Sequence, residues 1–279
     1  MSGPEFLTAG VMGWPIGHSL SPRLHGHWLQ RYGIAGAYVP MAVPPDRVGE
    51  AIRGVVALGL KGCNVTVPHK EAVMPFLDDV APAAKRIGAV NTIVVAEGGA
   101  TRGTNTDGFG FLENIKAGAP GWQPDSGPAL VIGAGGAARS ILVALADEGC
   151  PEIRLANRTK ERTDRVVHEL GSPLQAISWD ERSDAVNGAA LVVNTSTAGM
   201  EGQAELDLAL DELGPEAVVT DIVYVPLQTK LLAEASARGN RTVDGLGMLL
   251  HQARPGFEAW FGVAPVVDEA LRNAVLAPR

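Results

Sequence analysis

The sequence predicts an α/β protein with largely parallel sheets, arranged in two domains. Short apolar runs alternate with helix-like segments along nearly all of the 279 residues, as expected for strands joined by helices. This length suits one large domain or two moderate ones. A loose stretch rich in Gly and Pro, Ala117–Pro128, resembles a linker, and a second alternating series follows it.

Composition and charge exclude several classes of protein. With 46% apolar and 19% charged residues, the chain is neither a disordered tail nor a highly charged polymer binder. A net charge of −8 argues against a general nucleic-acid surface, so we expect no nucleic-acid partner. Only Cys63 and Cys150 are present, which gives no support to a disulfide framework or a Cys-based zinc site.

The N-terminus and the apolar runs favour a soluble protein of the cytoplasm. The first basic residue is Arg23, so the chain start lacks the charged region of a secretory signal. No uninterrupted apolar run approaches the roughly 20 residues that a membrane-spanning helix needs. We expect small molecules as partners, no membrane association, and either a monomer or a homodimer.

The first half of the chain is expected to contain five strands. Each is a short apolar run bounded by turn residues. They cover Phe6–Gly13, Ala37–Val43, Gly62–Val67, Ala89–Ala96 and Ala100–Thr106. Glu97-Gly98-Gly99 predicts a β-hairpin between the last two. Ser21 suits the N-cap of a first helix, with Pro22 at its first position, and Pro44-Pro45 introduces a second helix that ends near Leu58.

The second half repeats the alternation with four expected strands. They cover Ala129–Ile132, Ile153–Ala156, Leu191–Asn194 and Val218–Asp221. Helices are expected to begin near Gly136 and Lys160, directly after turn residues. Two further helical patterns, from Leu246 and from Val266, close the chain.

A glycine-rich turn, Gly133 to Ala138, ends one of these strands and opens a helix. Its G-x-G-x-x-A pattern is typical of dinucleotide binding: Gly133 permits the tight turn, and Gly135 lets a pyrophosphate approach the backbone. Ala138 is small enough for the helix to pack against the strand. Free N–H groups at the helix start then face the anion. A glycine turn without a ligand is the alternative, and it explains the shared register of strand, turn and helix less well.

The residues after the next strand indicate which dinucleotide binds. NAD sites place an acidic residue at that strand end to hold the ribose 2′-hydroxyl. Here the run is Asn157, Arg158, Thr159, Lys160, Glu161 and Arg162. Three cations and no carboxylate at the strand tip suit a 2′-phosphate, which a guanidinium binds bidentately. A solvated helix start is the alternative, but cations there oppose the helix dipole. We therefore expect NADP rather than NAD.

Polar residues in the first half form a candidate substrate site. Strand alternation places Asn64 and Thr66 on one face, and a helix starting at Pro68 would carry Lys70 back over it. Asn91 is an amide within an apolar strand, and Asp107 follows the hairpin. Taken singly, each also fits a solvated face, a sheet edge or a helix cap.

Beside a dinucleotide site, these residues favour oxidoreduction of an alcohol. Oxidising a secondary alcohol removes a hydroxyl proton while hydride leaves the carbon. A lysine does this near neutral pH if desolvation lowers its pKa and a carboxylate orients it, so Lys70 and Asp107 are the candidate pair. Zinc alcohol dehydrogenases use a metal for this step. The sequence has no matching Cys/His ligand set, and we expect no metal.

Seven segments in order along the chain resemble the shikimate dehydrogenase family. They are Gly13–Pro22, Asn64–Lys70, Ala89–Thr92, Asn105–Gly108, the glycine turn, Asn157–Thr159 and Asp244–Ala253. The resemblance implies NADP-linked interconversion of 3-dehydroshikimate and shikimate, on the pathway to chorismate and the aromatic amino acids. It also implies a substrate domain with a mixed sheet, made of residues 1–107 and 243–279, around a Rossmann-like NADP domain of residues 108–242.

The resemblance further implies roles for individual residues. Lys70 and Asp107 would be the catalytic pair. The implied substrate contacts are these two with Ser19, Ser21, Asn64, Thr66, Asn91, Tyr224 and Gln252. The implied cofactor contacts are Gly133, Ala134, Gly135, Gly136, Ala137, Ala138, Asn157, Arg158, Thr159, Arg162, Thr195, Ser196, Gly245 and Met248.

Two alternatives stay open at this point. A quinate/shikimate dehydrogenase using NAD or NADP would differ near Ser19 and Ser21, because quinate carries an extra ring hydroxyl. A ligand-binding regulator on the same scaffold would have lost the chemistry. The presence of both Lys70 and Asp107 argues against a regulator, since a sensor needs neither.

Overall fold

The computed structural model describes residues 5–277 and separates the chain into two compact units. The first unit runs up to Thr106 and takes in the chain again from Leu249, and the second is Asp107–Met248. Asp107 and residues 243–248 thus fall in the second unit, unlike the expected limits. The reason is packing: α4 (Asp107–Gly118) lies against α5 (Gly136–Asp147), and Met248 belongs to the second core.

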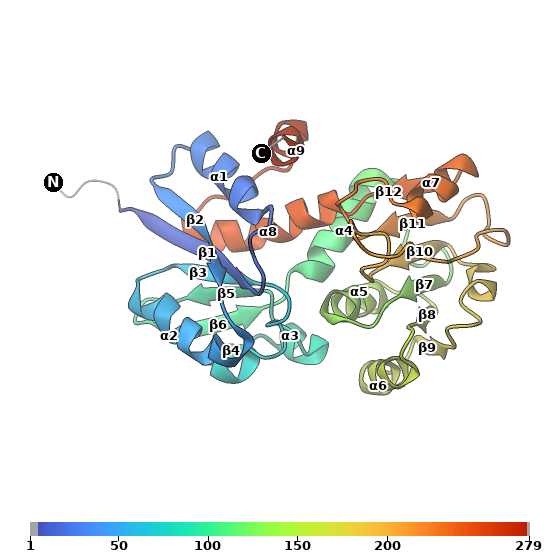
Figure 1. The fold of residues 1–279 in the computed structure, drawn as a ribbon, viewed down its shortest axis with the longest axis horizontal. Helices are drawn as coiled ribbons and strands as arrows, with labels where there is room; N and C mark the ends of the chain where they lie inside the picture. Colours follow the sequence, from blue (N-terminus) through green and yellow to red (C-terminus); the bar gives the residue numbers. More distant parts are fainter. Residues whose placement is uncertain (1–4, 278–279) are drawn as a thin grey trace. The chain divides into compact units, whose positions relative to one another are not determined.

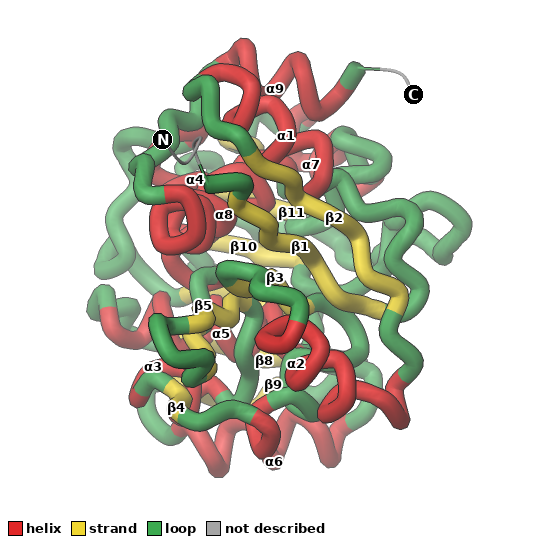
Figure 2. Tube along the Cα trace, turned by 90° about the vertical axis from the view of Figure 1, so that its left-hand side faces the viewer, coloured by secondary structure: helices red, strands yellow, loops and turns green. Residues whose placement is uncertain are grey.

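A six-stranded mixed sheet forms the first unit, in the order β2-β1-β3-β5-β6-β4. The strands are β1 (Leu7–Gly13), β2 (Gly36–Ala42), β3 (Gly62–Val65), β4 (Asp79–Val80), β5 (Thr92–Val95) and β6 (Thr101–Thr104). Figure 2 shows β1 and β2 side by side, and β1 pairs in parallel with both β2 and β3. β5 is antiparallel to β3 and β6, which confirms the predicted hairpin.

Helices cover both faces of this sheet, as strand alternation requires. Cys63 and Val65 of β3 pack in one apolar cluster with Ile52 and Val55 of α2 (Val48–Ala57). The helices α1 (Ser21–Arg31) and α8 (Leu246–Phe261) cover the opposite face (Figure 1). Their rings pack there with a ring from β2. These rings are His25, Trp28, Tyr38, Phe257, Trp260 and Phe261. The short helix α3 (Pro82–Ile87) and the C-terminal α9 (Glu269–Leu276) complete the unit.

The second unit is a six-stranded parallel sheet in the order β12-β11-β10-β7-β8-β9. The strands are β7 (Ala129–Ile132), β8 (Ile153–Ala156), β9 (Leu174–Ile177), β10 (Leu191–Asn194), β11 (Val218–Asp221) and β12 (Arg241–Val243). All four predicted strands are confirmed residue for residue. β9 and β12 were not predicted, because their sequences are short and half polar. The helix starts at Gly136 of α5 and Lys160 of α6 (Lys160–Leu170) are also confirmed.

The buried strands of this unit contribute side chains to two separate cores, one on each face of the sheet. Val131 and Leu155 point to the face covered by α4, α5 and α6. Their neighbours Leu130 and Ile132 point to the opposite face, where α7 (Lys230–Ala237) packs. Ala117–Pro128, expected as a loose linker, joins α4 to β7 inside this unit and does not separate the two units.

Several local predictions are wrong. Ser21 is the first residue of α1 and not its N-cap, which is Leu20; the Ser21 N–H instead donates to Ser19 Oγ at 3.3 Å. β3 ends at Val65, so the predicted alternation does not reach Val67, which is 70% exposed. The chain turns at Pro68 without starting a helix there.

Two further boundaries differ at the ends of elements. Asn91 directly precedes β5 instead of lying within it. The last helix begins at Glu269, because the Asp268 carboxylate accepts a hydrogen bond from the Leu271 N–H and caps it. Among residues 5–277, every helix is too short or too polar to span a bilayer.

We predict that Phe257→Ala lowers the free energy of unfolding by about 3–5 kcal/mol, the usual cost of emptying a buried aromatic site. Phe257 is fully buried, with its ring centroid 5.1 Å from that of Trp28 and 4.8 Å from that of Phe261. Urea denaturation followed by circular dichroism measures the change. The matched control is Phe6→Ala at a 65% exposed site, where the expected change is within about 0.5 kcal/mol. Equal losses in both variants would contradict the packing argument.

Candidate functional site

The glycine turn after β7 is shaped by close contact with a neighbouring turn. Gly133 has φ of +108°, and a Cβ there would lie 2.7 Å from Thr195 Oγ1 and 3.1 Å from the Ser196 nitrogen. Only glycine avoids both the strained backbone and that overlap. The Gly133 N–H donates to the Ala156 carbonyl at 2.8 Å, so the turn is also tied to the end of β8.

Gly135 is constrained in a different way. It is the N-cap of α5 with φ of −90°, and a Cβ there would meet no protein atom within 4 Å. The protein itself leaves room for a side chain, whereas a ligand approaching the backbone would not. The first N–H groups of α5 lack intrahelical acceptors and attract an anion. Ala138 is fully buried on the side that packs against the sheet. The half-buried Ala134, Gly136 and Ala137 complete a turn that fits a pyrophosphate.

The tip of β8 carries two guanidinium groups available to a phosphate. Lys160 forms an ion pair with Asp164 at 2.5 Å, so its charge is compensated. Arg158 and Arg162 are exposed and form no ion pair with any described residue. Asn157 donates from Nδ2 to the Thr159 carbonyl at 3.0 Å, which shapes the turn into α6. Of the three predicted cations, two arginines therefore remain without an ion pair to a described residue.

Buried polar bonds hold the Thr195–Ser196 turn at the end of β10. The Thr195 hydroxyl donates to the Ile132 carbonyl at 2.7 Å. The Ser196 N–H and hydroxyl both donate to Asn194 Oδ1, at 3.0 and 2.7 Å. Asn194 Nδ2 in turn donates to Asp221 Oδ1 at 3.0 Å.

Asp221 connects this turn to the loop that carries Tyr224. Its carboxylate also accepts from the Val223 N–H at 2.9 Å and from the Thr229 hydroxyl at 2.8 Å. Burial raises the pKa of Asp221 above its ordinary value. Sequence reasoning missed Asp221, although Asn194 and Asp221 are polar residues that end adjacent apolar strands in register, which is a usable signal.

Three further residues predicted from the resemblance lie in the second unit. Tyr224 is half-buried after β11, and burial raises the pKa of its phenol. A Cβ at Gly245 would lie 2.4 Å from the Ile222 carbonyl oxygen, so backbone packing alone requires glycine there. Met248 is buried in the core beneath α5.

The first unit contains a separate buried network of polar side chains. Asn64 Nδ2 donates to the Asn91 carbonyl and to the Thr92 hydroxyl, both at 3.1 Å. The Thr92 hydroxyl donates to Asn91 Oδ1 at 2.8 Å. Tyr38 donates from Oη to Asn64 Oδ1 at 2.6 Å. Sequence reasoning found Asn64 and Asn91 but missed Tyr38 and Thr92, which are typical residues of ordinary strands.

The network continues to the returning helix α8. Asn91 Nδ2 donates to Thr106 Oγ1 at 3.0 Å and to Gln252 Oε1 at 3.2 Å. The Thr106 hydroxyl donates to the Gln252 carbonyl at 2.8 Å. Asp107 follows Thr106 directly and is buried, with 5% of its surface exposed. The fold thus brings the predicted residues Asn64, Asn91 and Gln252 into one network. Asn91 and Gln252 are 161 positions apart in the sequence.

The remaining predicted residues of the first unit lie in loops after β1 and β3. These strands are parallel neighbours, so their carboxyl ends share one edge of the sheet. Ser19 follows β1, while Thr66 and Lys70 follow β3, and all three are half-buried. The Val90 N–H donates to the Lys70 carbonyl at 2.8 Å. The Lys70 backbone is therefore held beside the residue that precedes Asn91.

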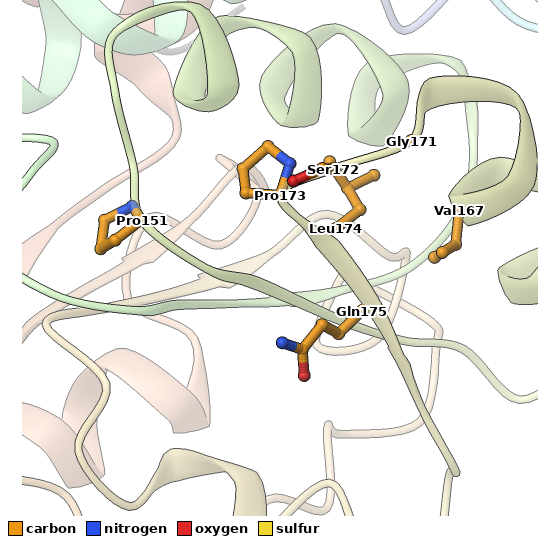
Figure 3. A pocket seen from close by; sticks show the side chains of 7 residues that line it. All are labelled: Pro151, Val167, Gly171, Ser172, Pro173, Leu174 and Gln175. Atoms are coloured by element: carbon orange, nitrogen blue, oxygen red, sulfur yellow. The ribbon is translucent and has the colours of Figure 1, made fainter.

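Other features of the described chain offer no competing site. A depression lined by Pro151, Val167 and Gly171 to Gln175 lies where β8 and β9 begin, and none of these side chains is charged (Figure 3). It is at the opposite strand ends from the glycine turn. Within residues 5–277, no three His, Cys, Asp or Glu side chains are grouped to hold a metal ion.

Two protein families match successive parts of the chain. Residues 11–93 match the family described as shikimate dehydrogenase substrate binding domain. Residues 123–205 match the family described as shikimate / quinate 5-dehydrogenase.

Individual relatives extend the similarity to nearly the whole chain. It is 58% identical to the shikimate dehydrogenase (NADP(+)) of Paramagnetospirillum magneticum, over 99% of this chain and 100% of the relative. The shikimate 5-dehydrogenase of Thermus thermophilus, solved with NADP(H) and shikimate, is 38% identical with a TM-score of 0.86, over 97% and 98% of the chains. The quinate dehydrogenase of Corynebacterium glutamicum, solved with NAD, is 28% identical with a TM-score of 0.89, over 97% and 99%.

Proposed function

Because the chain belongs to the shikimate dehydrogenase family, we propose that it reduces 3-dehydroshikimate reversibly to shikimate with NADPH. It is an oxidoreductase that acts on a CH–OH group, in the shikimate pathway to chorismate and the aromatic amino acids. The observation that carries this conclusion is 58% identity over essentially the full length to an NADP-dependent shikimate dehydrogenase.

The second unit supplies residues that fit NADP. The backbone of Gly133 to Ala138 would hold the pyrophosphate, because the first N–H groups of α5 lack intrahelical acceptors and Gly135 has no side chain. Arg158 and Arg162, with Asn157 and Thr159, would hold the ribose 2′-phosphate. Thr195, Ser196, Gly245 and Met248 are proposed to lie toward the nicotinamide. When bound, the dinucleotide accepts a hydride from the substrate ring or returns one to it.

Lys70 and Asp107 are proposed to exchange the substrate proton. When shikimate is oxidised, its hydroxyl must lose a proton as the carbonyl forms, and reduction returns that proton. An ammonium and a carboxylate hydrogen-bonded to the same hydroxyl act as one coupled pair that takes up and returns it. Thr106 is anchored to Gln252, and this fixes the chain position from which Asp107 starts α4.

The polar residues of the first unit are proposed to recognise a polyhydroxylated carboxylate ring. Ser19 Oγ accepts the Ser21 N–H, so the Ser19 hydroxyl hydrogen is left to donate to a carboxylate. Ser21 would add a second neutral donor. Asn64, Thr66, Asn91 and Gln252, with Tyr224 from the second unit, are proposed to bind ring hydroxyls. Such a site rejects analogues that lack a hydroxyl, because its own groups would be left unpaired.

Quinate with NAD is the competing reaction, and the similarity to a quinate dehydrogenase solved with NAD makes it worth testing. The tip of β8 argues for NADP, because Arg158 is exposed there and Asp164 already pairs with Lys160. We also propose that the protein acts in the cytoplasm on small molecules alone, with no nucleic-acid partner, as a monomer or a homodimer.

The direct test is a spectrophotometric assay of shikimate and quinate, each with NADP and with NAD. We expect turnover of shikimate with NADP to exceed the other three combinations by kcat/KM. Faster oxidation of quinate with NAD would replace the proposed substrate and cofactor together.

Lys70→Ala should lower kcat by about 10²–10⁴-fold, the usual contribution of one acid–base group. The affinity for NADPH, measured by fluorescence titration, should stay unchanged, because Lys70 lies in the first unit. The matched control is Lys61→Ala, which removes a half-buried lysine paired with Glu5 at 2.7 Å and should leave turnover intact. Near-normal kcat in Lys70→Ala would refute the assigned role.

Arg158→Ala should weaken NADP binding by about 10–100-fold, since a bond to a charged group contributes about 1.5–3 kcal/mol. Binding of NAD, which lacks the 2′-phosphate, should change little. Lys160→Ala serves as the control, because its ion pair with Asp164 leaves less charge for the ligand. Isothermal titration with both dinucleotides measures the four affinities. Equal losses for NADP and NAD in Arg158→Ala would remove the 2′-phosphate argument.

A further inference from the structure

A hydroxyl outside the predicted site is hydrogen-bonded to one of its amides. Tyr38 of β2 donates from Oη to Asn64 Oδ1 at 2.6 Å, and both side chains are buried. Burial raises the pKa of Tyr38 well above its usual value, so the phenol keeps its hydrogen. Nothing in the motifs that carry the family resemblance includes this residue.

The contacts around Asn64 allow one orientation of its amide. Nδ2 gives its two hydrogens to the Asn91 carbonyl and the Thr92 hydroxyl. A flipped amide would place Oδ1 against the Asn91 carbonyl oxygen, where two acceptors would face each other. It would also turn Nδ2 toward the Tyr38 hydroxyl and away from that carbonyl. The Asn91 carbonyl, which can only accept, therefore selects the orientation, and the Tyr38 hydroxyl donates to the oxygen that this orientation presents.

We infer that Tyr38 is a positioning residue that holds Asn64 Oδ1 in place as an acceptor for a substrate hydroxyl. Both Asn64 N–H hydrogens are used within the protein, and Tyr38 occupies one of the two lone pairs on Oδ1. The remaining lone pair can only accept a hydrogen. A ring hydroxyl supplies one, whereas a carboxylate oxygen or a ketone oxygen does not. The inference rests on the proposed function, in which the substrate is a hydroxylated ring acid.

The ring of Tyr38 is held independently of its hydroxyl. The His25 imidazole lies flat on it, with ring centroids 3.8 Å apart and planes 3° from parallel. Trp260 packs at 6.0 Å from another side. Burial lowers the pKa of His25 to about 3, so the stacked ring is neutral and adds no charge to the network. Removing the hydroxyl alone should leave this packing in place.

The test is Tyr38→Phe, which keeps the ring and deletes the donor. We expect the KM for shikimate to rise about tenfold, the effect of one lost hydrogen bond, while the KM for NADP and the melting temperature stay nearly unchanged. Tyr32→Phe is the matched control. The Tyr32 hydroxyl accepts the Val266 N–H at 3.0 Å near the C-terminal segment, and its loss should not alter either KM.

A double-mutant cycle decides whether Tyr38 acts through Asn64. In an Asn64→Ala background, Tyr38→Phe should raise the KM for shikimate no further. A further tenfold rise there would overturn the inference, as would an unchanged KM in the single Tyr38→Phe variant of an active enzyme. A wild-type protein that does not turn over shikimate would instead overturn the proposed function, and the inference with it.

Discussion

The carboxamide and backbone of Asn91 form the contact on which the substrate-binding half depends. The Asn91 carbonyl accepts from the Val65 N–H and from Asn64, and its N–H donates to the Thr104 carbonyl. Its side chain bonds Thr106 and Gln252. One buried residue therefore joins β3, β6 and the returning helix α8. A buried amide with unmatched partners is costly, so these segments are stable only in the register that satisfies it.

The cofactor-binding half uses the same principle at different strand ends. A buried carboxylate, Asp221, bonds Asn194 and Thr229, and Asn194 bonds Ser196. The turns after β10 and β11 are thereby fixed relative to each other. Gly133 approaches Thr195 so closely that its turn takes its shape from the same network. In both halves, several groups proposed to meet ligands, such as Thr66, Lys70 and Thr195, lie in short loops that follow strand ends.

Prediction from sequence succeeded where the signal is local. The strands β7, β8, β10 and β11 are continuous apolar runs between turn residues, and their limits are confirmed residue for residue. Prediction was wrong where contacts with other residues determine the local structure. Ser21 has the chemistry of an N-cap, yet the Ser19 hydroxyl takes its N–H and the helix starts one residue earlier. β9 and β12 have weak strand patterns and are formed by pairing with β8 and β11.

The sequence by itself determined the fold class, the family and the chemistry of the glycine turn, because each depends on residue types at short fixed spacings. The glycine pattern after one strand can be recognised from neighbouring residues alone. The same is true of the cations at the tip of the next strand. Only the tertiary structure decided that Tyr38 donates to Asn64, that Asn91 and Gln252 meet, and that Lys160 pairs with Asp164 while Arg158 has no ion pair among the described residues. Hydrogen bonds depend on distances between atoms, and folding brings together residues whose separation along the chain carries no information about those distances.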